Sequence, residues 1–132
     1  MISHVLDTCA VLDLAAGRWR RPAAQAALDR AAYPVVLSLS VWEIARKLRL
    51  GKLELRCEQN GVLDFVQDLC GRYDLHVVPV GPEICQEAEL LPPHHEDPLD
   101  RMIIAAARLA RAPIFTTDPK FARYFVEVLP QR

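Results

Sequence analysis

Residues 2–8 read Ile-Ser-His-Val-Leu-Asp-Thr, a short apolar segment that stops at an acidic residue. Such a run, bounded by polar residues, is typical of a strand that is buried on both faces of a sheet. Pro79 lies in another such run and places it at a sheet edge or a strand end, because proline cannot donate to a ladder. In all, four further segments predict strands of this kind: 35–39, 76–80, 114–117 and 126–129.

Helical stretches separate these strands. They are predicted over residues 8–16, 22–32, 41–50, 60–72, 83–91 and 98–111. Strands that alternate with helices indicate βαβ units and therefore a mostly parallel sheet with helices on both faces. The sequence predicts the α/β class, and the absence of repeats, low-complexity tracts and linkers predicts a single domain over residues 1–132.

Composition excludes several classes of protein. A hydrophobic fraction of 52% and a charged fraction of 25% exclude a disordered chain. The balance of 16 Lys+Arg against 17 Asp+Glu, a net charge of −1, leaves only a local patch for any contact with RNA or DNA. The apolar runs are shorter than the ~20 residues that cross a bilayer, and no basic-then-apolar leader precedes Asp7, so no contact with a membrane is expected.

The cysteines have neither a C-x-x-C spacing nor paired histidines at zinc-finger distance. They are Cys9, Cys57, Cys70 and Cys85. A chain of this length with a normal core does not need a disulfide scaffold. The sequence therefore predicts reduced thiols in a cytoplasmic protein.

Four acidic residues lie where predicted strands end or predicted helices begin: Asp7, Glu43, Asp100 and Asp118. Each also has a simple structural explanation. Asp7 and Asp118 can cap the helices that follow them, and a cap stabilises a helix by about 1 kcal/mol. Ser40 and Glu43 have the spacing of a capping box, and Glu43 can pair with Lys47 one turn later. The local pattern alone favours a capping role for Glu43.

Asp100 favours a functional interpretation. Asp97 before Pro98 is a strong helix start, and Asp100 could complete a capping box there. The helix is otherwise almost entirely apolar, and Asp100 aligns with Ile103 and Ala107 on its buried face. A partly buried carboxylate requires a partner, so we expect Asp100 to take part in a site.

The carboxyl ends of parallel strands meet at one edge of the sheet, where we expect all four acids to converge. Two carboxylates ~5 Å apart repel by about 3 kcal/mol at an effective dielectric near 20. A helix N-terminus returns only about 0.3–1 kcal/mol per charge. The cluster must therefore take up protons or bind a cation, and ligation by oxygen alone suits Mg²⁺ or Mn²⁺. Thr116 should point its hydroxyl toward the same edge.

Several stretches together resemble a known family. They are Val5–Thr8, Ser40–Ala45 running into Leu50–Leu53, Leu91–Arg101, and Thr116–Asp118 followed by Phe121-Ala122. In this order and spacing the chain resembles the PIN-domain ribonucleases, and specifically the VapC-type toxins of bacterial toxin–antitoxin modules, from Ile2 to about Leu129. The resemblance implies a single PIN domain, a three-layer α/β/α sandwich with five strands in the order 3-2-1-4-5.

The resemblance also implies roles for individual residues. The catalytic and metal-binding positions of the family match Asp7, Glu43, Asp100 and Asp118, and Thr116 matches a threonine beside them. Asp97 matches the first acid of the D-P-x-D-R motif and is assigned to helix capping. Cys9 stands where such proteins often carry histidine or another residue and could alter sensitivity to thiophilic metals, and Leu99 replaces a frequent phenylalanine.

The function implied is that of a Mg²⁺- or Mn²⁺-dependent endoribonuclease, the toxin of a type II toxin–antitoxin system. Asp7, Asp100 and Asp118 would be the main metal ligands, and Glu43 would bind metal through water or orient the nucleophile. The products would carry 5′-phosphate and 3′-hydroxyl ends. The resemblance further implies a homodimer, inhibited by a cognate VapB-type antitoxin whose C-terminal segment covers the acidic site.

Contact with RNA must come from local basic residues. One candidate set follows Glu43: Arg46, Lys47, Arg49 and Lys52. A second is the loop Arg18-Trp19-Arg20-Arg21, in which Arg18 and Arg20 could hold phosphates and Trp19 could stack a base. Both runs are equally well explained as a solvated helix face or loop. Trp42 could belong to the core, a dimer contact or an antitoxin groove, and His94 and His95 are predicted to be solvated loop residues.

Two other classes of function require residue patterns that this chain lacks. A signalling receiver domain needs an adjacent acidic pair after its first strand and a lysine after its last strand, and this chain has neither. An aspartyl phosphatase needs D-x-D at the first strand, whereas this chain has Asp7-Thr8-Cys9 without the second acid. A PIN-like RNA- or protein-binding module without catalysis, a PIN nuclease of RNA maturation and a DNA-directed nuclease remain as alternatives.

Overall fold

The sheet is built from five strands that all pair in parallel. In the computed structural model, which describes residues 1–56 and 61–132, the strand order is β3-β2-β1-β4-β5. The strands are β1 (His4–Leu6), β2 (Pro34–Leu37), β3 (His76–Val78), β4 (Ile114–Phe115) and β5 (Val128–Leu129). The predicted α/β class and the strand order 3-2-1-4-5 are confirmed. β3 is an edge strand that ends just before Pro79, as the proline indicates.

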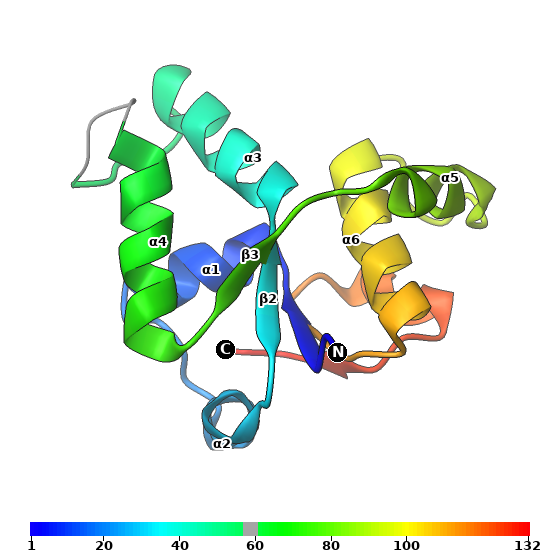
Figure 1. Cartoon of the computed structure of the whole chain (residues 1–132), viewed down its shortest axis with the longest axis horizontal. Helices are drawn as coiled ribbons and strands as arrows, with labels where there is room; N and C mark the ends of the chain where they lie inside the picture. The colour runs from blue at the N-terminus through cyan, green and yellow to red at the C-terminus, as the bar shows by residue number, and fades with distance from the viewer. Residues whose placement is uncertain (57–60) are drawn as a thin grey trace.

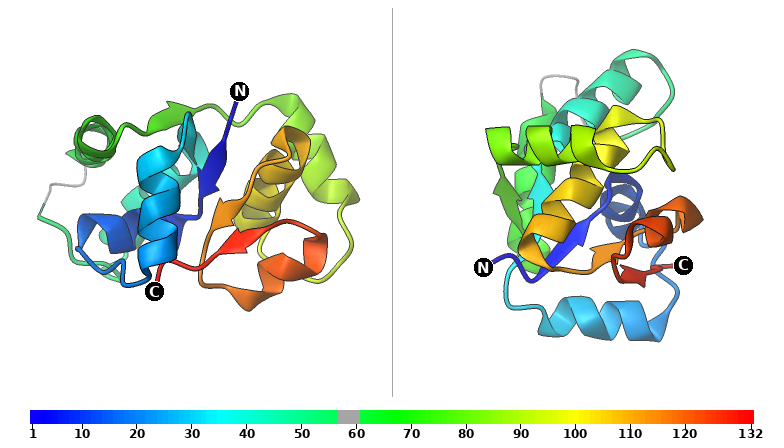
Figure 2. Two further views of the ribbon diagram at one scale, coloured as in Figure 1. Left: turned by 90° about the horizontal axis from the view of Figure 1, so that it is seen from below. Right: turned by 90° about the vertical axis from the view of Figure 1, so that its right-hand side faces the viewer.

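Helices cover both faces of this sheet (Figures 1 and 2). Consecutive strand residues point to opposite faces, so Val5 and Leu6, both completely buried, enter different cores. On the face of Val5 lie α5 (Pro82–Leu90) and α6 (Pro98–Ala110). The face of Leu6 is covered by α1 (Thr8–Ala15), α2 (Pro22–Arg30), α3 (Ser38–Arg49) and α4 (Val62–Tyr73). The molecule is therefore the three-layer α/β/α sandwich that was expected.

The carboxyl edge of the sheet gathers several helix starts. β1 runs through Asp7 into α1, and β2 runs directly into α3 at Ser38. β4 is followed by Thr116, Thr117 and Asp118, which lead into the 3₁₀ helix η2 (Pro119–Tyr124). The first turns of α3 and α6 lie at this same end of the strands (Figure 1).

The start of α3 differs from the prediction. The helix begins at Ser38 instead of residue 41, and Leu37 occupies the cap position without a side-chain hydrogen bond. Ser40 is completely buried, and its Oγ lies 2.8 Å from Oγ1 of Thr8 in α1. The capping box predicted for Ser40 and Glu43 is therefore wrong, because the serine hydroxyl is used in a contact between helices. Glu43 lies one turn inside the helix.

The remaining differences are small. The strands are mostly shorter than predicted, and the other described helices begin and end within about two residues of the predicted bounds.

Cys9, Cys70 and Cys85 are free thiols, whereas Cys57 and the predicted helix start at residue 60 lie outside the described residues. Among the described residues, no helix has both the length and the apolar character needed to cross a membrane.

Candidate functional site

A cavity of about 330 Å³ opens at the carboxyl edge of the sheet. All four predicted acids line it, each delivered by a different element: Asp7 from the β1–α1 junction, Glu43 from α3, Asp100 from α6 and Asp118 from the start of η2. Thr8, Cys9, Lys47, Asp97, Thr117 and Pro119 complete the lining. The structure thus brings the four acids together, and their roles as metal ligands stay a prediction.

Asp7 combines a structural role with a place in the cavity. Its Oδ1 accepts the backbone N–H of Thr8 at 2.8 Å and caps α1. Its Oδ2 accepts the Thr116 hydroxyl at 2.7 Å and the Cys9 thiol at 3.2 Å. Thr116 is completely buried behind Asp7 and also accepts the N–H of Asp118 at 3.1 Å. Thr116 therefore fixes the position of both strand-end acids without lining the cavity itself.

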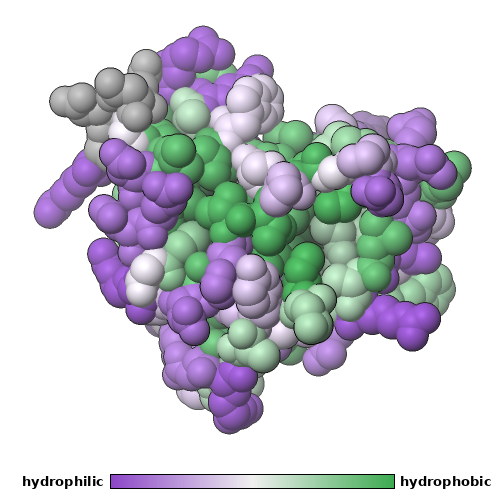
Figure 3. Space-filling view, in the orientation of Figure 1, coloured by the Kyte–Doolittle hydropathy of each residue, from purple (hydrophilic) through white to green (hydrophobic). Residues whose placement is uncertain are grey.

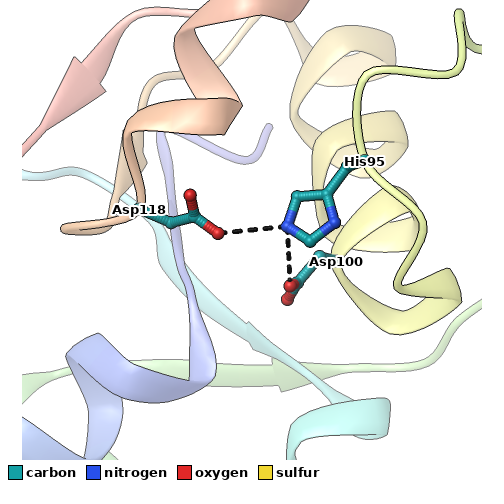
Figure 4. Close-up of side chains that lie close together, drawn as sticks. All are labelled: His95, Asp100 and Asp118. Atoms are coloured by element: carbon teal, nitrogen blue, oxygen red, sulfur yellow. Dashed lines mark hydrogen bonds and ion pairs between the residues drawn. The ribbon is translucent and has the colours of Figure 1, made fainter.

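Asp118 and Asp100 meet through a histidine. Asp118 caps η2 with Oδ1, which accepts the N–H of Lys120 at 2.9 Å. The other oxygen, Oδ2, lies 3.0 Å from Nε2 of His95, and Oδ2 of Asp100 lies 3.0 Å from the same nitrogen (Figure 4). One ligand atom from each of His95, Asp100 and Asp118 lies within 4.8 Å of the other two.

His95 was predicted to be solvated, and this prediction is wrong. The residue is only 9% exposed. Its backbone N–H donates to the Tyr124 hydroxyl at 2.7 Å, and its ring packs edge-on against Phe121 at a centroid distance of 5.8 Å. The sequence offered one signal, a histidine two residues before the N-cap Asp97 of an apolar helix. His94, in contrast, is exposed as expected.

The hydrogen bonds of His95 assign its protons. Nδ1 accepts the backbone N–H of Asp97 at 3.2 Å, so this nitrogen carries no proton. In the neutral ring the proton then lies on Nε2, the nitrogen that faces Asp100 and Asp118. A protonated Nε2 donates hydrogen bonds and cannot bind a metal. We therefore assign His95 as a hydrogen-bond donor to Asp118, with Asp100 in close contact with the same N–H.

Arg101 holds the loop that presents His95. Its guanidinium donates to the carbonyl oxygens of Ala88 and Leu91 at 2.8 Å, of Pro92 at 3.0 Å and of His95 at 3.1 Å. The bonds to Ala88 and Leu91 satisfy carbonyls at the end of α5 that no helical N–H reaches, and the other two hold the loop. Arg101, which follows Asp100 in α6, thus connects this helix to the end of α5 and to the loop that carries His95.

Glu43 has one paired and one unpaired oxygen. Its Oε2 lies 3.2 Å from Nζ of Lys47, which confirms the predicted pair one helical turn apart. Its Oε1 is buried and has no hydrogen-bond partner among the described residues. An unsatisfied buried acceptor costs about 1–3 kcal/mol, and more when the group is charged. Because Glu43 lines the cavity, this oxygen is available to a cation or to a cation-bound water.

The electrostatics of the cavity favour an added positive charge. Burial, and next the negative charges of the neighbouring acids, raise the pKa of Asp100 to about 8. Burial also raises the pKa of Asp7, with a smaller contribution from Glu43 and partial opposition from the Thr116 and Cys9 hydrogen bonds. Burial and the charge of Asp7 raise the pKa of Cys9 to about 11, so the thiol stays protonated and donates to Asp7. The all-oxygen carboxylate set fits Mg²⁺ or Mn²⁺.

The predicted basic residues lie at different distances from this site. Lys47 lines the cavity, and Arg46 lines a neighbouring one with it. Arg18 and Arg20 are exposed and line neither cavity. Of the two explanations open for Trp19, the structure favours the structural one, because its partly buried ring packs against the core.

Trp19 fills the space beneath α1. Its ring centroid lies 5.0 Å from that of Phe115, and its Nε1 donates to the carbonyl of Ala10 at 3.0 Å. Both the face and the polar edge of the indole are therefore used inside the protein. This environment indicates that Trp19 stabilises the fold.

A family model matches most of the chain, and several solved structures are similar to it in fold. The PIN domain model matches residues 4–125. A toxin–antitoxin complex from Klebsiella pneumoniae is similar in structure, with a TM-score of 0.67, 18% identity and 98% of each chain covered. VapBC2 from Rickettsia felis, bound to a DNA fragment from its promoter, gives a TM-score of 0.67, 15% identity and 98% of each chain.

A third solved structure has the same fold. FitAcB from Neisseria gonorrhoeae gives a TM-score of 0.62 at 17% identity, with 97% of each chain covered. At these identities the likeness shows the fold alone. No curated protein matches the sequence.

The raised pKa of Asp100 predicts a pH-dependent stability in metal-free protein. The folded state holds this proton up to about pH 8, whereas the ordinary value is 3.8. The contribution of Asp100 to stability is therefore fully present below about pH 4 and is lost as the pH rises toward 8. Asparagine does not ionise, so the variant Asp100→Asn does not lose stability in this way as the pH rises. In urea unfolding with EDTA, the stability of Asp100→Asn relative to wild type should increase from pH 5 to pH 8 by at least about 1 kcal/mol.

Asp68, which is exposed on α4, provides the matched control. Asp68→Asn should change stability by the same amount at both pH values. A constant difference between Asp100→Asn and wild type across this range would show that Asp100 is not held in its protonated form.

The assignment of His95 as a donor predicts different outcomes for two substitutions. His95→Ala removes the N–H that donates to Asp118 and contacts Asp100, and it should weaken Mn²⁺ binding by about 10- to 100-fold. His95→Gln keeps an N–H donor near the Nε2 position and should bind Mn²⁺ within about threefold of wild type. Isothermal titration calorimetry measures both affinities. An equal, large loss in both variants would instead identify His95 as a metal ligand.

Proposed function

The chain belongs to the PIN-domain family, and from this premise we propose that it is a Mg²⁺- or Mn²⁺-dependent endoribonuclease, the toxin of a type II toxin–antitoxin system. The observation that carries the proposal is the cavity shared by Asp7, Glu43, Asp100 and Asp118. The raised pKa of Asp100 and the lack of a hydrogen-bond partner for Oε1 of Glu43 among the described residues both indicate that the cluster lacks a positive charge. A bound divalent cation would favour the ionised form of Asp100 and would interact with Oε1 of Glu43.

The residues of this chain have distinct tasks in the proposed hydrolysis. Asp7, Asp100 and Asp118 would hold the ion, which when bound lowers the pKa of water and stabilises charge on the phosphate and the leaving oxygen. Thr116 holds Asp7, and His95 holds Asp100 and Asp118 at a fixed separation, so the carboxylates need little rearrangement.

Glu43 and Lys47 are placed for other tasks at the cavity. The unpaired Oε1 of Glu43 can accept a hydrogen bond from the attacking water and orient it toward the phosphorus. Lys47 pairs with the other oxygen of Glu43 and lines the cavity, where its charge can contact a phosphate. Arg46, on the same helix, is the second substrate-binding residue of the proposal. Arg18 and Arg20 would contact only a more distant part of an RNA.

The toxin assignment extends to partners. The similar structures from Klebsiella pneumoniae and Rickettsia felis are a toxin–antitoxin complex and VapBC2 on promoter DNA. They support a cognate VapB-type antitoxin as partner. A single PIN domain over residues 1–132, a homodimer, a cytoplasmic location and cleavage to 5′-phosphate and 3′-hydroxyl ends are further parts of the proposal.

A PIN-like module that binds RNA or protein without cutting, and a PIN nuclease of RNA maturation, are the alternatives. The full set of four acids supports an active enzyme, because a module that only binds has no use for a cluster that repels RNA phosphates. A maturation nuclease would share the chemistry and differ in its target.

An RNA cleavage assay tests the proposal. Purified protein is incubated with total RNA and Mg²⁺, Mn²⁺ or EDTA, beside the variants Asp7→Asn and Asp118→Asn. Asparagine is as good a helix cap as aspartate, so these variants should fold. Cleavage should require the metal and fall by at least about 100-fold in each variant, a loss of about 2.7 kcal/mol of transition-state stabilisation.

Asp97→Asn is the matched control, because Asp97 caps α6 through Oδ1 at 2.9 Å from the N–H of Leu99 and has no proposed part in catalysis. Its cleavage rate should stay within about threefold of wild type. Equal cutting by wild type and Asp7→Asn, or cutting in EDTA, would overturn the proposal.

A further inference from the structure

A large aromatic residue stands exposed beside the acidic cavity. Trp42 is 55% exposed, although tryptophan is a residue that proteins usually bury. It precedes Glu43 on α3, and it is not part of either core. The guanidinium carbon of Arg46 lies 5.8 Å from the centre of its ring, within the range of a cation–π contact. The indole is therefore held beside a positive charge at the surface.

Trp42 forms a wall of a second cavity. This cavity has a volume of about 350 Å³ and lies between α3, which supplies Trp42 and Arg46, and the first turn of α6, which supplies Pro98 and Leu99. The surface is hollowed between these two parts of the molecule (Figure 3). The volume falls in the range of about 300–1,000 Å³ that small ligands occupy.

The Trp42 cavity adjoins the acidic cavity. Glu43 and Lys47 line both of them. A group bound against Trp42 is thus next to any phosphate that is held at the four carboxylates. Arg49 lines a third cavity, of about 260 Å³, together with Trp42 and Arg46. Three cations and an aromatic ring follow one another along this side of α3.

We propose that the Trp42 cavity binds an unpaired nucleobase adjacent to the phosphate that is held at the four carboxylates. The inference rests on the proposed nuclease function and adds a base-binding subsite to it. A base can stack on the indole, while its flanking phosphates meet Arg46 and Lys47. Bases inside a duplex are stacked on one another and cannot reach such a ring, so a double-stranded RNA is excluded from the cavity.

Charge complementarity favours a nucleotide over an apolar peptide. The cavity is lined by two cations, Arg46 and Lys47, and two acids, Glu43 and Asp97, beside its apolar wall of Pro98 and Leu99, and Arg49 adds a third cation next to Trp42. An apolar side chain would remove water from these charges without replacing its hydrogen bonds. A nucleotide offers a flat ring to the apolar wall and phosphate oxygens to the cations. These cations also offset the repulsion between the acidic cluster and the RNA backbone.

RNA binding by Trp42 variants tests the proposal directly. The probe is a short, end-labelled single-stranded RNA of mixed sequence, titrated with protein in the Asp7→Asn background so that no RNA is cut. Fluorescence anisotropy should show that Trp42→Ala weakens binding by about tenfold or more, because stacking on one base is lost. Trp42→Phe keeps an aromatic ring and should bind within about threefold of the parent protein. A duplex of the same sequence should bind more weakly, and Trp42→Ala should not change its affinity.

Tryptophan emission provides a readout that a merely structural role would not change. A base stacked on Trp42 should quench the emission of the parent protein, and this quenching should disappear in Trp42→Phe although the RNA still binds. Leu63→Ala, at another exposed apolar residue on α4, is the control and should leave both affinity and quenching unchanged.

Two results would overturn the inference. Unchanged affinity of Trp42→Ala for the single strand, with wild-type protein still cutting RNA in the cleavage assay, would reject the base site and leave the nuclease function standing. Unchanged RNA affinity together with lost binding of a co-expressed antitoxin would identify the cavity as a protein-docking surface. Because the binding assay does not depend on cleavage, an inactive wild-type protein would reject only the nuclease function.

Discussion

Mutual repulsion among buried carboxylates is the constraint around which this structure is arranged. β1 and β4 are neighbouring parallel strands, so their carboxyl ends lie side by side, and Asp7 and Asp118 follow those ends. The helices α3 and α6 bring Glu43 and Asp100 to the same cavity. The apolar cores that fix these four elements on both faces of the sheet also oppose any separation of the acids. Proton uptake by Asp100, with its pKa near 8, is the response of the protein when no cation is bound.

A frame of hydrogen bonds holds the acids in this unfavourable arrangement. Thr116 binds Asp7, His95 bridges Asp100 and Asp118, and Tyr124 and Arg101 fasten the His95 loop. The Thr116 hydroxyl carries no charge, Nδ1 of His95 accepts a hydrogen bond, and Arg101 donates to backbone carbonyls, so these contacts do not neutralise the carboxylates. The frame therefore positions the oxygens and leaves the charge deficit in place, which is the arrangement a metal-dependent hydrolase requires.

Local sequence patterns predicted much of this arrangement, and long-range contacts account for what they missed. Uniformly apolar runs identified the strands, and acids at their ends identified the site, because both features depend on a few neighbouring residues. The strand order came from the family resemblance. The local pattern misplaces the start of α3, because it does not reveal the contact of Ser40 with Thr8. It also misses the burial of His95, because Tyr124 and Phe121, which bury this residue, belong to a distant segment. The contact of Trp19 with Phe115 likewise depends on a distant segment, so the local pattern left its role open.

The most direct test of the central claim is anomalous diffraction from crystals of the wild-type protein grown with Mn²⁺. The account predicts an anomalous peak bonded to oxygens of Asp7, Asp100 and Asp118, with Nε2 of His95 hydrogen-bonded to the carboxylates and not to the metal. Electron density that shows the four carboxylates in their present positions with no anomalous peak among them would contradict the account.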